Sequence, residues 1–219
     1  MFDLQESGVI CKQLNASSIL TVAQYRDISK LIFYTDRFIY PALFGNGTTG
    51  LENAMKILPD IFERSCDEMF HKQNLYIAFK NTSIVGLLLW HKGRLNWDPS
   101  ILVNYAEKND IELNKCNIEK VHAEYVMNRY SDRDMLDEQK ISIINICVKE
   151  SFRGHGIATS LISSFIEEHK NERMELNVLS NNNQAITVYL KMGFEVCDES
   201  PGFSLTNAKP PCLTMVREL

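Results

Sequence analysis

The sequence predicts a mixed α/β fold, and three observations lead to this prediction. Two β-rich runs flank a short polar turn at residues 81–82, which is the pattern of a β-hairpin. Beyond residue 141, apolar strand-like runs alternate with segments whose apolar residues recur at helical spacing. Helical spacing also dominates the chain before the hairpin. Elements in this order bury their apolar faces by packing helices on a sheet.

The N-terminal segment is expected to form one strand and then a helix. The run VICKQL predicts a strand at 9–14. Thr21 then precedes apolar residues at helical spacing, and Gln24 stands three residues after it, which is the spacing of a capping box. We therefore expect a helix over 21–34.

The following stretch should interrupt this pattern before a second helix begins. It contains Pro41 and three glycines, which favour turns. Thr49 and Glu52 again have capping-box spacing, so the second helix is expected to start at Thr49. Pro59 should kink or restart this helix, because proline lacks the N–H that an inner helical turn uses, and the helical stretch should reach about Phe70.

The middle of the chain is expected to hold a hairpin and a more polar insertion. The β-rich runs predict strands at 75–80 and 83–92. The insertion covers 94–140, with a short helix expected after Pro99 and a second helix over 117–130.

The C-terminal third shows the most regular alternation. No internal repeat or Gly/Ser-rich linker divides the chain, so we expect a single domain over residues 1–219. We expect strands at 141–149, 174–180, 193–199 and 212–219, and helices at 157–170 and 183–192.

Charge and hydropathy limit the classes of partner. The formal net charge is -5, which argues against binding to a nucleic-acid backbone and suits a cationic substrate better. No apolar run approaches the roughly 20 residues of a membrane span, and the first residues lack the pattern of a signal peptide. We expect a soluble cytoplasmic protein that binds neither nucleic acid nor membrane.

The six cysteines do not indicate a metal site. No two of them form a CxxC pair, and no histidine stands in register with them, so neither zinc binding nor a redox motif is predicted. We expect most of them to be buried thiols and expect no metal.

The stretch FRGHGIA at 152–158 predicts an anion site. It stands between an apolar strand-like run and a helical segment. Free backbone N–H groups and the positive end of the helix dipole attract anions there, and glycines allow a phosphate to approach the main chain. Arg153 adds a charged, forked donor.

Two common phosphate-binding motifs do not fit this stretch. A P-loop would need GxxxxGK[ST], which is absent. A dinucleotide-binding fingerprint would need a third glycine where Thr159 stands, and an acid at the end of the next strand, where the sequence is LSNNN. The sequence therefore disfavours the hypothesis of a nucleotide-binding protein that uses this helix start for another phosphate.

The pattern R-x-x-G-x-A after an apolar strand instead resembles the acetyl-CoA motif of the GNAT superfamily of N-acyltransferases. The following stretch NVLSNNNQAITVYLKMGF resembles that family's next strand and helix, and together the matches cover about 141–196. Alanine at the last position replaces the more common glycine of the family. The matching positions are Arg153, Gly156, Ala158, Asn182, Ala185, Tyr189, Gly193 and Phe194.

This resemblance implies a fold and an activity. The fold would be a GNAT-like mixed, mostly antiparallel twisted sheet of about seven strands with helices on both faces. Residues 141–196 would bind acetyl-CoA, and 1–140 would form the acceptor side with its insertion at 94–140. The activity would be transfer of the acetyl group to a primary amine of a small molecule or a peptide, by direct attack of the amine on the thioester.

The resemblance also implies which residues contact the cosubstrate. The pantetheine arm would add like a strand beside β-strand residues, and the N–H of Ile146 would hold the thioester oxygen. Asn182 would lie near the pantetheine or the strand end. The pantetheine would follow Ile146, Cys147 and Val148, and the pyrophosphate would rest on Arg153, Gly154, His155, Gly156, Ile157, Ala158 and Thr159.

The strand ISIINICV carries one further pattern. Its apolar phase changes between Ile143 and Ile144. A β-bulge would cause this change, and burial of both strand faces explains it equally well. Both interpretations stay open at this point.

Tyr189 is the residue expected to act in catalysis. By the family resemblance it would protonate the departing CoA thiolate. The alternative is that Tyr189 is a core residue, because it stands three positions after Ile186 on one helical face.

The general base is not identified. Asp36, His91, His122 and Glu124 lie in segments that shape the acceptor pocket in relatives, but each also suits a surface or packing role. His155 is better interpreted as a spacer whose backbone N–H faces phosphate. A catalytically silent acyl-CoA-binding module therefore stays open as the alternative function, and a homodimer as an assembly.

Overall fold

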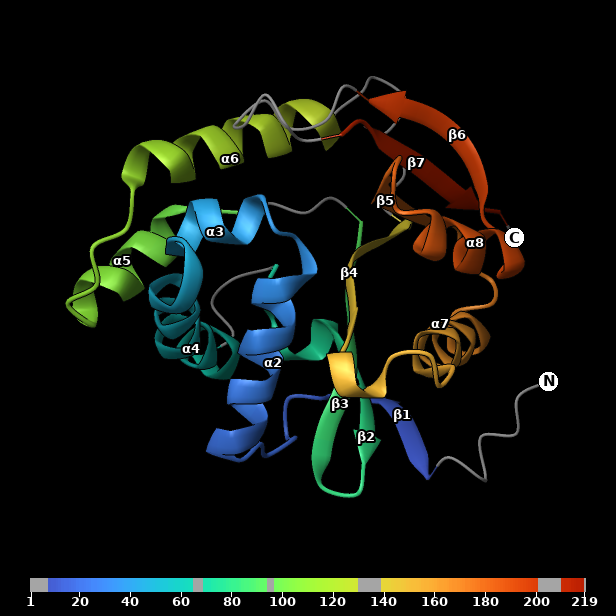
Figure 1. Ribbon diagram of the computed structural model, residues 1–219, viewed down its shortest axis with the longest axis horizontal. Coiled ribbons are helices and arrows are strands. Elements are labelled where there is room, and N and C mark those ends of the chain that lie inside the picture. The colour runs from blue at the N-terminus through green and yellow to red at the C-terminus, as the bar shows by residue number, and fades with distance from the viewer. Residues whose placement is uncertain (1–7, 65–68, 94–96, 130–138, 201–209, 219) are drawn as a thin grey trace.

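The computed structural model describes residues 8–64, 69–93, 97–129, 139–200 and 210–218, and within 124–129 it describes the helix without side chains. A seven-stranded sheet in the order β1-β2-β3-β4-β5-β7-β6 runs through its centre (Figure 1). Adjacent strands are antiparallel except for β4 and β5, which are parallel. The strands are β1 (Val9–Gln13), β2 (Leu75–Lys80), β3 (Ser83–Lys92), β4 (Ile141–Val148), β5 (Met174–Leu179), β6 (Glu195–Ser200) and β7 (Cys212–Arg217).

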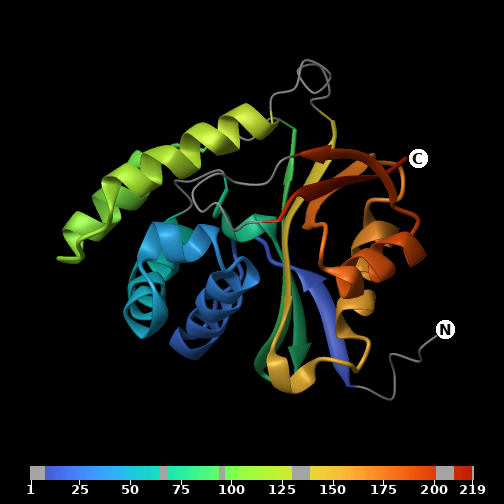
Figure 2. The same ribbon diagram turned by 45° about the horizontal axis from the view of Figure 1, so that its top comes forward.

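Helices cover both faces of this sheet, as Figures 1 and 2 show. One face packs against the helices that precede β4, and the other against the two that follow it, so that two apolar clusters are separated by the sheet. The mixed, mostly antiparallel fold predicted from the sequence is confirmed. The first layer holds α2 (Val22–Thr35), α3 (Ile39–Phe44), α4 (Gly47–Arg64), α5 (Ser100–Lys108) and α6 (Lys115–Arg129), and the second holds α7 (Ile157–Glu168) and α8 (Asn183–Lys191).

Local sequence rules fixed several elements correctly. The hairpin strands have the expected bounds, and Asn81 between them adopts a positive φ of 54°, as a tight turn requires. The capping box of α2 is present, because Gln24 N–H donates to the Thr21 hydroxyl and the Thr21 N–H donates to the Gln24 side chain. These elements depend on neighbouring residues alone.

The region around Pro41 was predicted wrongly, because it forms the helix α3. Asp36 Oδ1 accepts hydrogen bonds from the N–H groups of Phe38 (2.7 Å) and Ile39 (3.0 Å), which supplies the start that the helix needs. Pro41 lies in the first turn, where its missing N–H has no partner to lose.

The second helix was also predicted wrongly in two respects. α4 begins at Gly47 rather than at Thr49, and it continues without a break through Pro59. The apolar residues that flank the proline are fully buried, so their burial outweighs the roughly 3 kcal/mol that an internal proline costs. These residues are Ile57, Leu58, Ile61 and Phe62.

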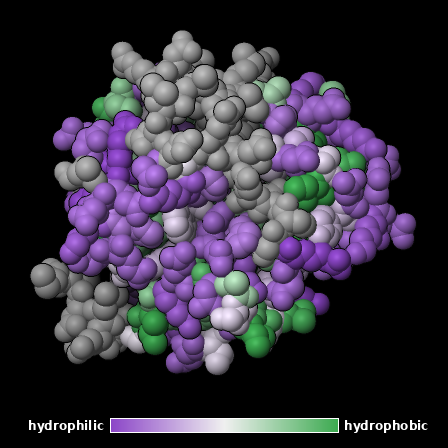
Figure 3. Space-filling view, turned by 180° about the vertical axis from the view of Figure 1, so that it is seen from behind, coloured by the Kyte–Doolittle hydropathy of each residue, from purple (hydrophilic) through white to green (hydrophobic). Residues whose placement is uncertain are grey.

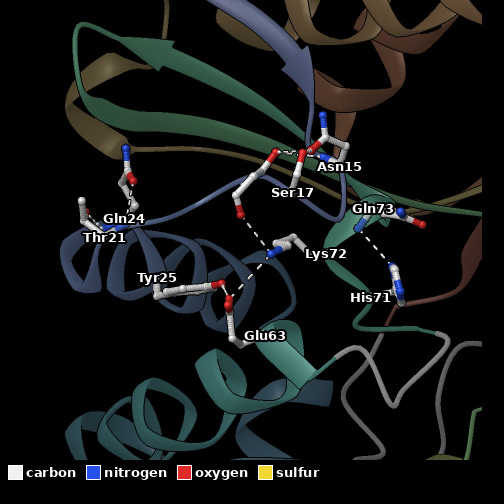
Figure 4. A network of polar contacts seen from close by, with 10 residues as sticks. Asn15, Ser17, Thr21, Gln24, Tyr25, Glu63, His71, Lys72 and Gln73 are labelled. Carbon is white, nitrogen blue, oxygen red and sulfur yellow. Dashed lines mark hydrogen bonds and ion pairs between the residues drawn. The ribbon is translucent and has the colours of Figure 1, made fainter.

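A buried lysine connects α4 to the segment before α2 (Figure 4). The side chain of Lys72 is 6% exposed, and its Nζ donates to the carbonyl of Ser18 (2.9 Å). The same Nζ lies 3.7 Å from the carboxylate of Glu63, which also accepts a hydrogen bond from the hydroxyl of Tyr25. A buried ammonium requires such partners, and this one thereby ties three segments together.

Most cysteines are not buried thiols, so that expectation was wrong. Among the described cysteines, Cys147 is buried, Cys116 on α6 and Cys197 on the edge strand β6 are exposed, and Cys11 and Cys212 are intermediate. Cys116 and Cys197 are exposed because they lie on an outer helix and on an edge strand of the sheet.

Gly50 allows α3 and α4 to meet. A Cβ placed on Gly50 would lie 1.7 Å from the carbonyl oxygen of Gly45, which follows α3. Asn53 Nδ2 donates to the carbonyl of Phe44 (2.9 Å) at the same junction. Since the clash would involve backbone, no side-chain rotation can relieve it.

We expect Gly50→Ala to lower the free energy of unfolding by about 3 kcal/mol because of this clash. For a chain of this size, this loss lowers Tm by roughly 6 to 12 °C. The control is Gly47→Ala three residues earlier, where a Cβ would meet nothing within 4 Å and only the positive φ of 61° is strained. That variant should lose about 1 kcal/mol. Equal melting temperatures for the two variants would contradict the proposed contact.

Candidate functional site

The parallel strands β4 and β5 separate along their length. Among the described residues they pair only from Ile141 opposite Met174 to Ile143 opposite Leu176. Beyond these positions, β4 continues beside β3 as far as Val148, and β5 continues beside β7. In the part of the chain that the structure describes, one edge of β4 therefore has no strand partner over its second half.

A β-bulge lies in β4 where the two strands separate. Leu89 of β3 pairs with Asn145, whereas its neighbour Trp90 pairs with Ile143, so Ile144 is an extra residue without a partner on β3. The phase change seen in the sequence thus has a bulge as its cause. After the bulge, the apolar side chains of β4 alternate in the opposite phase.

The bulge decides which amides of β4 point away from β3. Before it, the N–H of Ile141 donates to the residue that precedes β5 (2.9 Å). After it, the N–H of Lys149 donates to a carbonyl of β3 (2.8 Å). Since successive residues direct their amides to opposite sides, the amides of Ile146 and Val148 point to the unpaired edge. Without the extra residue, they would have pointed to β3.

The loop that follows β4 presents free backbone N–H groups. Gly154 and Gly156 have φ of 79° and 76°, and a Cβ on either would meet nothing within 4 Å. The first N–H of α7 that reaches a carbonyl is that of Ser160, which donates to Gly156 (2.9 Å). Within the described part of the chain, the N–H groups of 154–159 bond to no other residue. Such a loop fits a phosphate group.

Arg153 places a positive charge beside these N–H groups. Its Nε donates to the carbonyl of Val148 (3.1 Å), which ties the loop to the unpaired edge of β4. His155 lies 2.9 Å through Nδ1 from the carbonyl of Arg153, and a carbonyl can only accept, so Nδ1 carries a proton. The ring thus braces the loop, which agrees with its interpretation as a spacer.

α7 is held close to the sheet, which fixes the position of its N-terminus. Gly86 of β3 allows this approach, because a Cβ there would lie 3.0 Å from Leu161 and 3.3 Å from Ile157. Ile157, Leu161 and Phe165 are buried along one face of the helix. Because the helix is packed tightly on the sheet, the free N–H groups at its N-terminus are held in a fixed position.

Tyr189 lies on α8 with its ring among the apolar residues of the second cluster. It contacts Phe194 edge-on at 6.1 Å between ring centroids, and burial raises the pKa of Tyr189 to about 12. Its hydroxyl bonds to no residue that the structure describes. The ring thus packs as a core residue does, while the hydroxyl keeps its proton at neutral pH.

Asn182 lies three residues after the end of β5 and caps α8. Its Oδ1 accepts from the N–H of Ala185 (3.2 Å), and its own N–H donates to Leu179 (2.9 Å). The side chain therefore fixes the start of the helix that carries Tyr189. Among the described residues, Asn182 makes no hydrogen bond to β4.

The four candidate bases belong to different parts of the fold, namely the start of α3, β3 and α6. His91 lies on β3 opposite Ser142, with Nδ1 3.3 Å from the carbonyl of Gly93. His122 packs edge-on against Trp97 (5.8 Å), Asp36 caps α3, and the side chain of Glu124 lies outside the described residues. Of these, only His91 is on a strand next to β4.

One polar contact beside the bulge was missed from the sequence. The hydroxyl of Tyr40 on α3 donates to Oδ1 of Asn145 over 2.6 Å. Both residues are buried, with exposed fractions of 2% and 7%. An asparagine inside the apolar run ISIINICV could have been noticed, because a buried amide needs a partner.

The surface adds little about partners. None of the helices among the described residues is long and apolar enough to cross a membrane, and no group of three or more potential metal ligands is found there. The face shown in Figure 3 is largely hydrophilic where it is coloured, with small separate hydrophobic patches. Large exposed apolar residues are spread over several elements, namely Ile10, Ile19, Val22, Tyr34, Leu190 and Val196.

Comparison with known families gives a match over most of the chain. Residues 51–194 match the sequence model of the Acetyltransferase (GNAT) family. That range contains the hairpin, the bulged strand, the glycine loop and Tyr189.

A curated relative matches over a shorter range. The L-amino acid N-acetyltransferase AaaT of Escherichia coli (strain K12) is 33% identical over 73 residues. The match covers 32% of this chain and 45% of that protein, so it spans less than half of the relative.

Solved structures resemble the whole fold at low sequence identity. Mosquito arylalkylamine N-acetyltransferase like 5b superposes with a TM-score of 0.62 at 14% identity, covering 96% of this chain and 100% of the other. The histone acetyltransferase HPA2 and related acetyltransferase from Corynebacterium glutamicum ATCC 13032 gives 0.61 at 15% identity, covering 96% of both chains. A GNAT family acetyltransferase from Elizabethkingia anophelis with acetyl-CoA bound gives 0.51 at 15%, covering 97% and 99%.

Proposed function

Because the chain belongs to the acetyltransferase (GNAT) family, we propose that it transfers the acetyl group of acetyl-CoA to a primary amine on a small molecule or a peptide. Family membership makes it an acyltransferase with acetyl-CoA as its cosubstrate. The observation that carries the finer proposal is the unpaired edge of β4, which leads directly into the open glycine loop. Residues 141–196 form the acetyl-CoA core, and 1–140 form the acceptor side of a single domain.

The chain's own residues would hold the cosubstrate along this path. The backbone N–H groups of 154–159 and the Arg153 guanidinium would bind the pyrophosphate. The amides of Ile146 and Val148 would pair with the pantetheine, which extends the sheet at its unpaired edge. Bound there, acetyl-CoA supplies the acyl group as a thioester.

Ile146 and Tyr189 would then stabilise the charges that develop during transfer. The N–H of Ile146 donates to the thioester oxygen as that oxygen gains negative charge. Tyr189 donates a hydrogen bond to the leaving sulfur. Because the pKa of Tyr189 is raised to about 12, above the roughly 8.5 of a thiol, the phenol stays protonated at neutral pH. As the C–N bond forms and the C–S bond breaks, the sulfur takes the phenol proton of Tyr189, and the proton that the amine nitrogen loses restores the phenol.

The acceptor must be a neutral amine when it attacks the thioester. A primary amine of pKa about 10.4 is neutral in only roughly one molecule in 2,500 at pH 7, so the reaction should accelerate with pH in the neutral range. The net charge of -5 favours the approach of the cationic form, which then loses its proton. A silent acyl-CoA-binding module would instead show binding without turnover.

The experiment that tests the proposal is thermal unfolding with acetyl-CoA, CoA, ATP or NAD added separately at equal concentration. A ligand at 100 times its Kd stabilises a protein by about 2.7 kcal/mol, which is roughly 5 to 10 °C here. We expect this shift with the two CoA compounds alone. A larger shift with ATP or NAD would refute the assignment, and a shift without turnover of any amine would favour the silent module.

Arg153→Ala should weaken CoA binding about 10- to 100-fold, because it removes a charge-assisted contact with phosphate. Isothermal titration with CoA measures this directly. The matched control is Arg26→Ala, which removes an equally exposed arginine from α2 on the other side of the sheet and should leave the Kd unchanged. Equal affinities for both variants would count against the loop as the phosphate site.

Tyr189→Phe should lower kcat by about 100-fold, the lower end of the range for a lost general acid, and should leave the Kd for acetyl-CoA nearly unchanged. The variant keeps the ring that contacts Phe194, so folding should be preserved. Steady-state assays with the best amine found in a screen, together with titration of acetyl-CoA, separate the two effects. Full activity at neutral pH would remove Tyr189 from the mechanism.

A further inference from the structure

The β-bulge of β4 needs something to hold it in register. An extra residue in a strand costs a ladder hydrogen bond, and a strand that slipped by one residue would turn its side chains to the opposite faces. Asn145 is the residue just after the bulge. Its side chain lies on the sheet face that α2–α6 cover only because β4 contains the extra residue. Any interaction that keeps Asn145 on that face therefore also keeps the bulge in place.

The hydrogen bond from Tyr40 is such an interaction. The hydroxyl donates to Asn145 Oδ1 over 2.6 Å, and both side chains are buried away from competing water. In the slipped register, Asn145 would face the second apolar cluster, and its amide would be buried there without this donor. The bond thus favours the bulged register specifically.

Tyr40 itself is held from both ends of α3. Asp36 accepts from two N–H groups at the start of the helix, and Asn53 donates to Phe44 at its end. The ring of Tyr40 also stacks on that of Phe44, with 6.5 Å between centroids and 11° between planes. The hydroxyl is therefore presented to β4 from a fixed helix.

We propose that Tyr40 is a positioning residue, which locks the β4 bulge through Asn145 and so directs the Ile146 amide toward the thioester. The inference rests on the proposed function, since it assumes that this amide meets acetyl-CoA. Tyr40 itself touches neither cosubstrate nor acceptor in this proposal. Tyr40 acts through the register of β4, although it lies 105 positions before Asn145 in the sequence.

The test compares two buried tyrosines on opposite faces of the sheet. Tyr40→Phe removes the hydroxyl that bonds Asn145. Tyr76→Phe is the matched control, because the Tyr76 side chain is also buried and its hydroxyl bonds Glu168 of α7 over 2.5 Å. Both variants lose one buried hydroxyl, so both should lose some stability. Only Tyr40→Phe should alter the Ile146 amide.

The first readout is the amide resonance of Ile146 in ¹⁵N-labelled protein titrated with acetyl-CoA. We expect a shift on binding in the wild type and in Tyr76→Phe, and its loss in Tyr40→Phe. The second readout is kinetic. Tyr40→Phe should lower kcat about tenfold and leave the KM for acetyl-CoA within about threefold, because the phosphate contacts are untouched.

A second variant covers the case in which Tyr40→Phe fails to fold. Asn145→Ala breaks the same bond from the other side and should give the same loss of the Ile146 response. The double variant should lose no more than the larger single loss, since only one bond is broken. If Tyr40→Phe and Asn145→Ala both behave like Tyr76→Phe, the positioning role is overturned and the transferase proposal stands. If acetyl-CoA leaves the wild-type protein unshifted in every resonance, both proposals fall.

Discussion

The structure depends on how one strand satisfies its backbone hydrogen bonds. β4 lies in the middle of the sheet, where its amides point alternately to the two neighbouring strands and normally all find a partner. The bulge and the departure of β5 leave the amides of Ile146 and Val148 directed at an edge without a strand. A buried strand with unmet amides is costly unless a ligand completes it. The site is therefore an unfinished sheet, which an extended ligand can complete.

The two helical layers have different tasks around this strand. On one side, α7 is drawn against Gly86 and holds the glycine loop at the end of β4. On the other side, the short helix α3 contacts the bulge through Tyr40. In the proposed mechanism, one layer holds the loop that binds phosphate, and the other sets the register of the strand that leads to it.

The sequence predicted those features that neighbouring residues determine. The hairpin bounds, the capping box at Thr21 and the helix that was expected from residue 157 depend on short-range patterns, and all agree with the structure. The glycine loop was identified for the same reason, because its chemistry is contained in a few consecutive residues.

The failures come from contacts between distant residues. α3 forms although Pro41 suggested a break, because Asp36 caps it and α4 packs against it at Gly50. The helix through Pro59 is stabilised by burial that no local pattern measures. The role of Asn145 could not be assigned, since its partner Tyr40 lies on a different element far away in the sequence. The general base could not be chosen for the same reason.

The order of the strands also has a consequence for how the chain folds. β3 and β4 are neighbours in the centre of the sheet, yet the whole of α5, α6 and their connections lies between them in the sequence. Closing this long loop carries an entropic cost before any hydrogen bond between the two strands compensates for it. The hairpin β2–β3 can form from local contacts, whereas the bulge, the unpaired edge and the cradle at α7 appear only after that closure. Binding competence should therefore be acquired late in folding and lost early in unfolding.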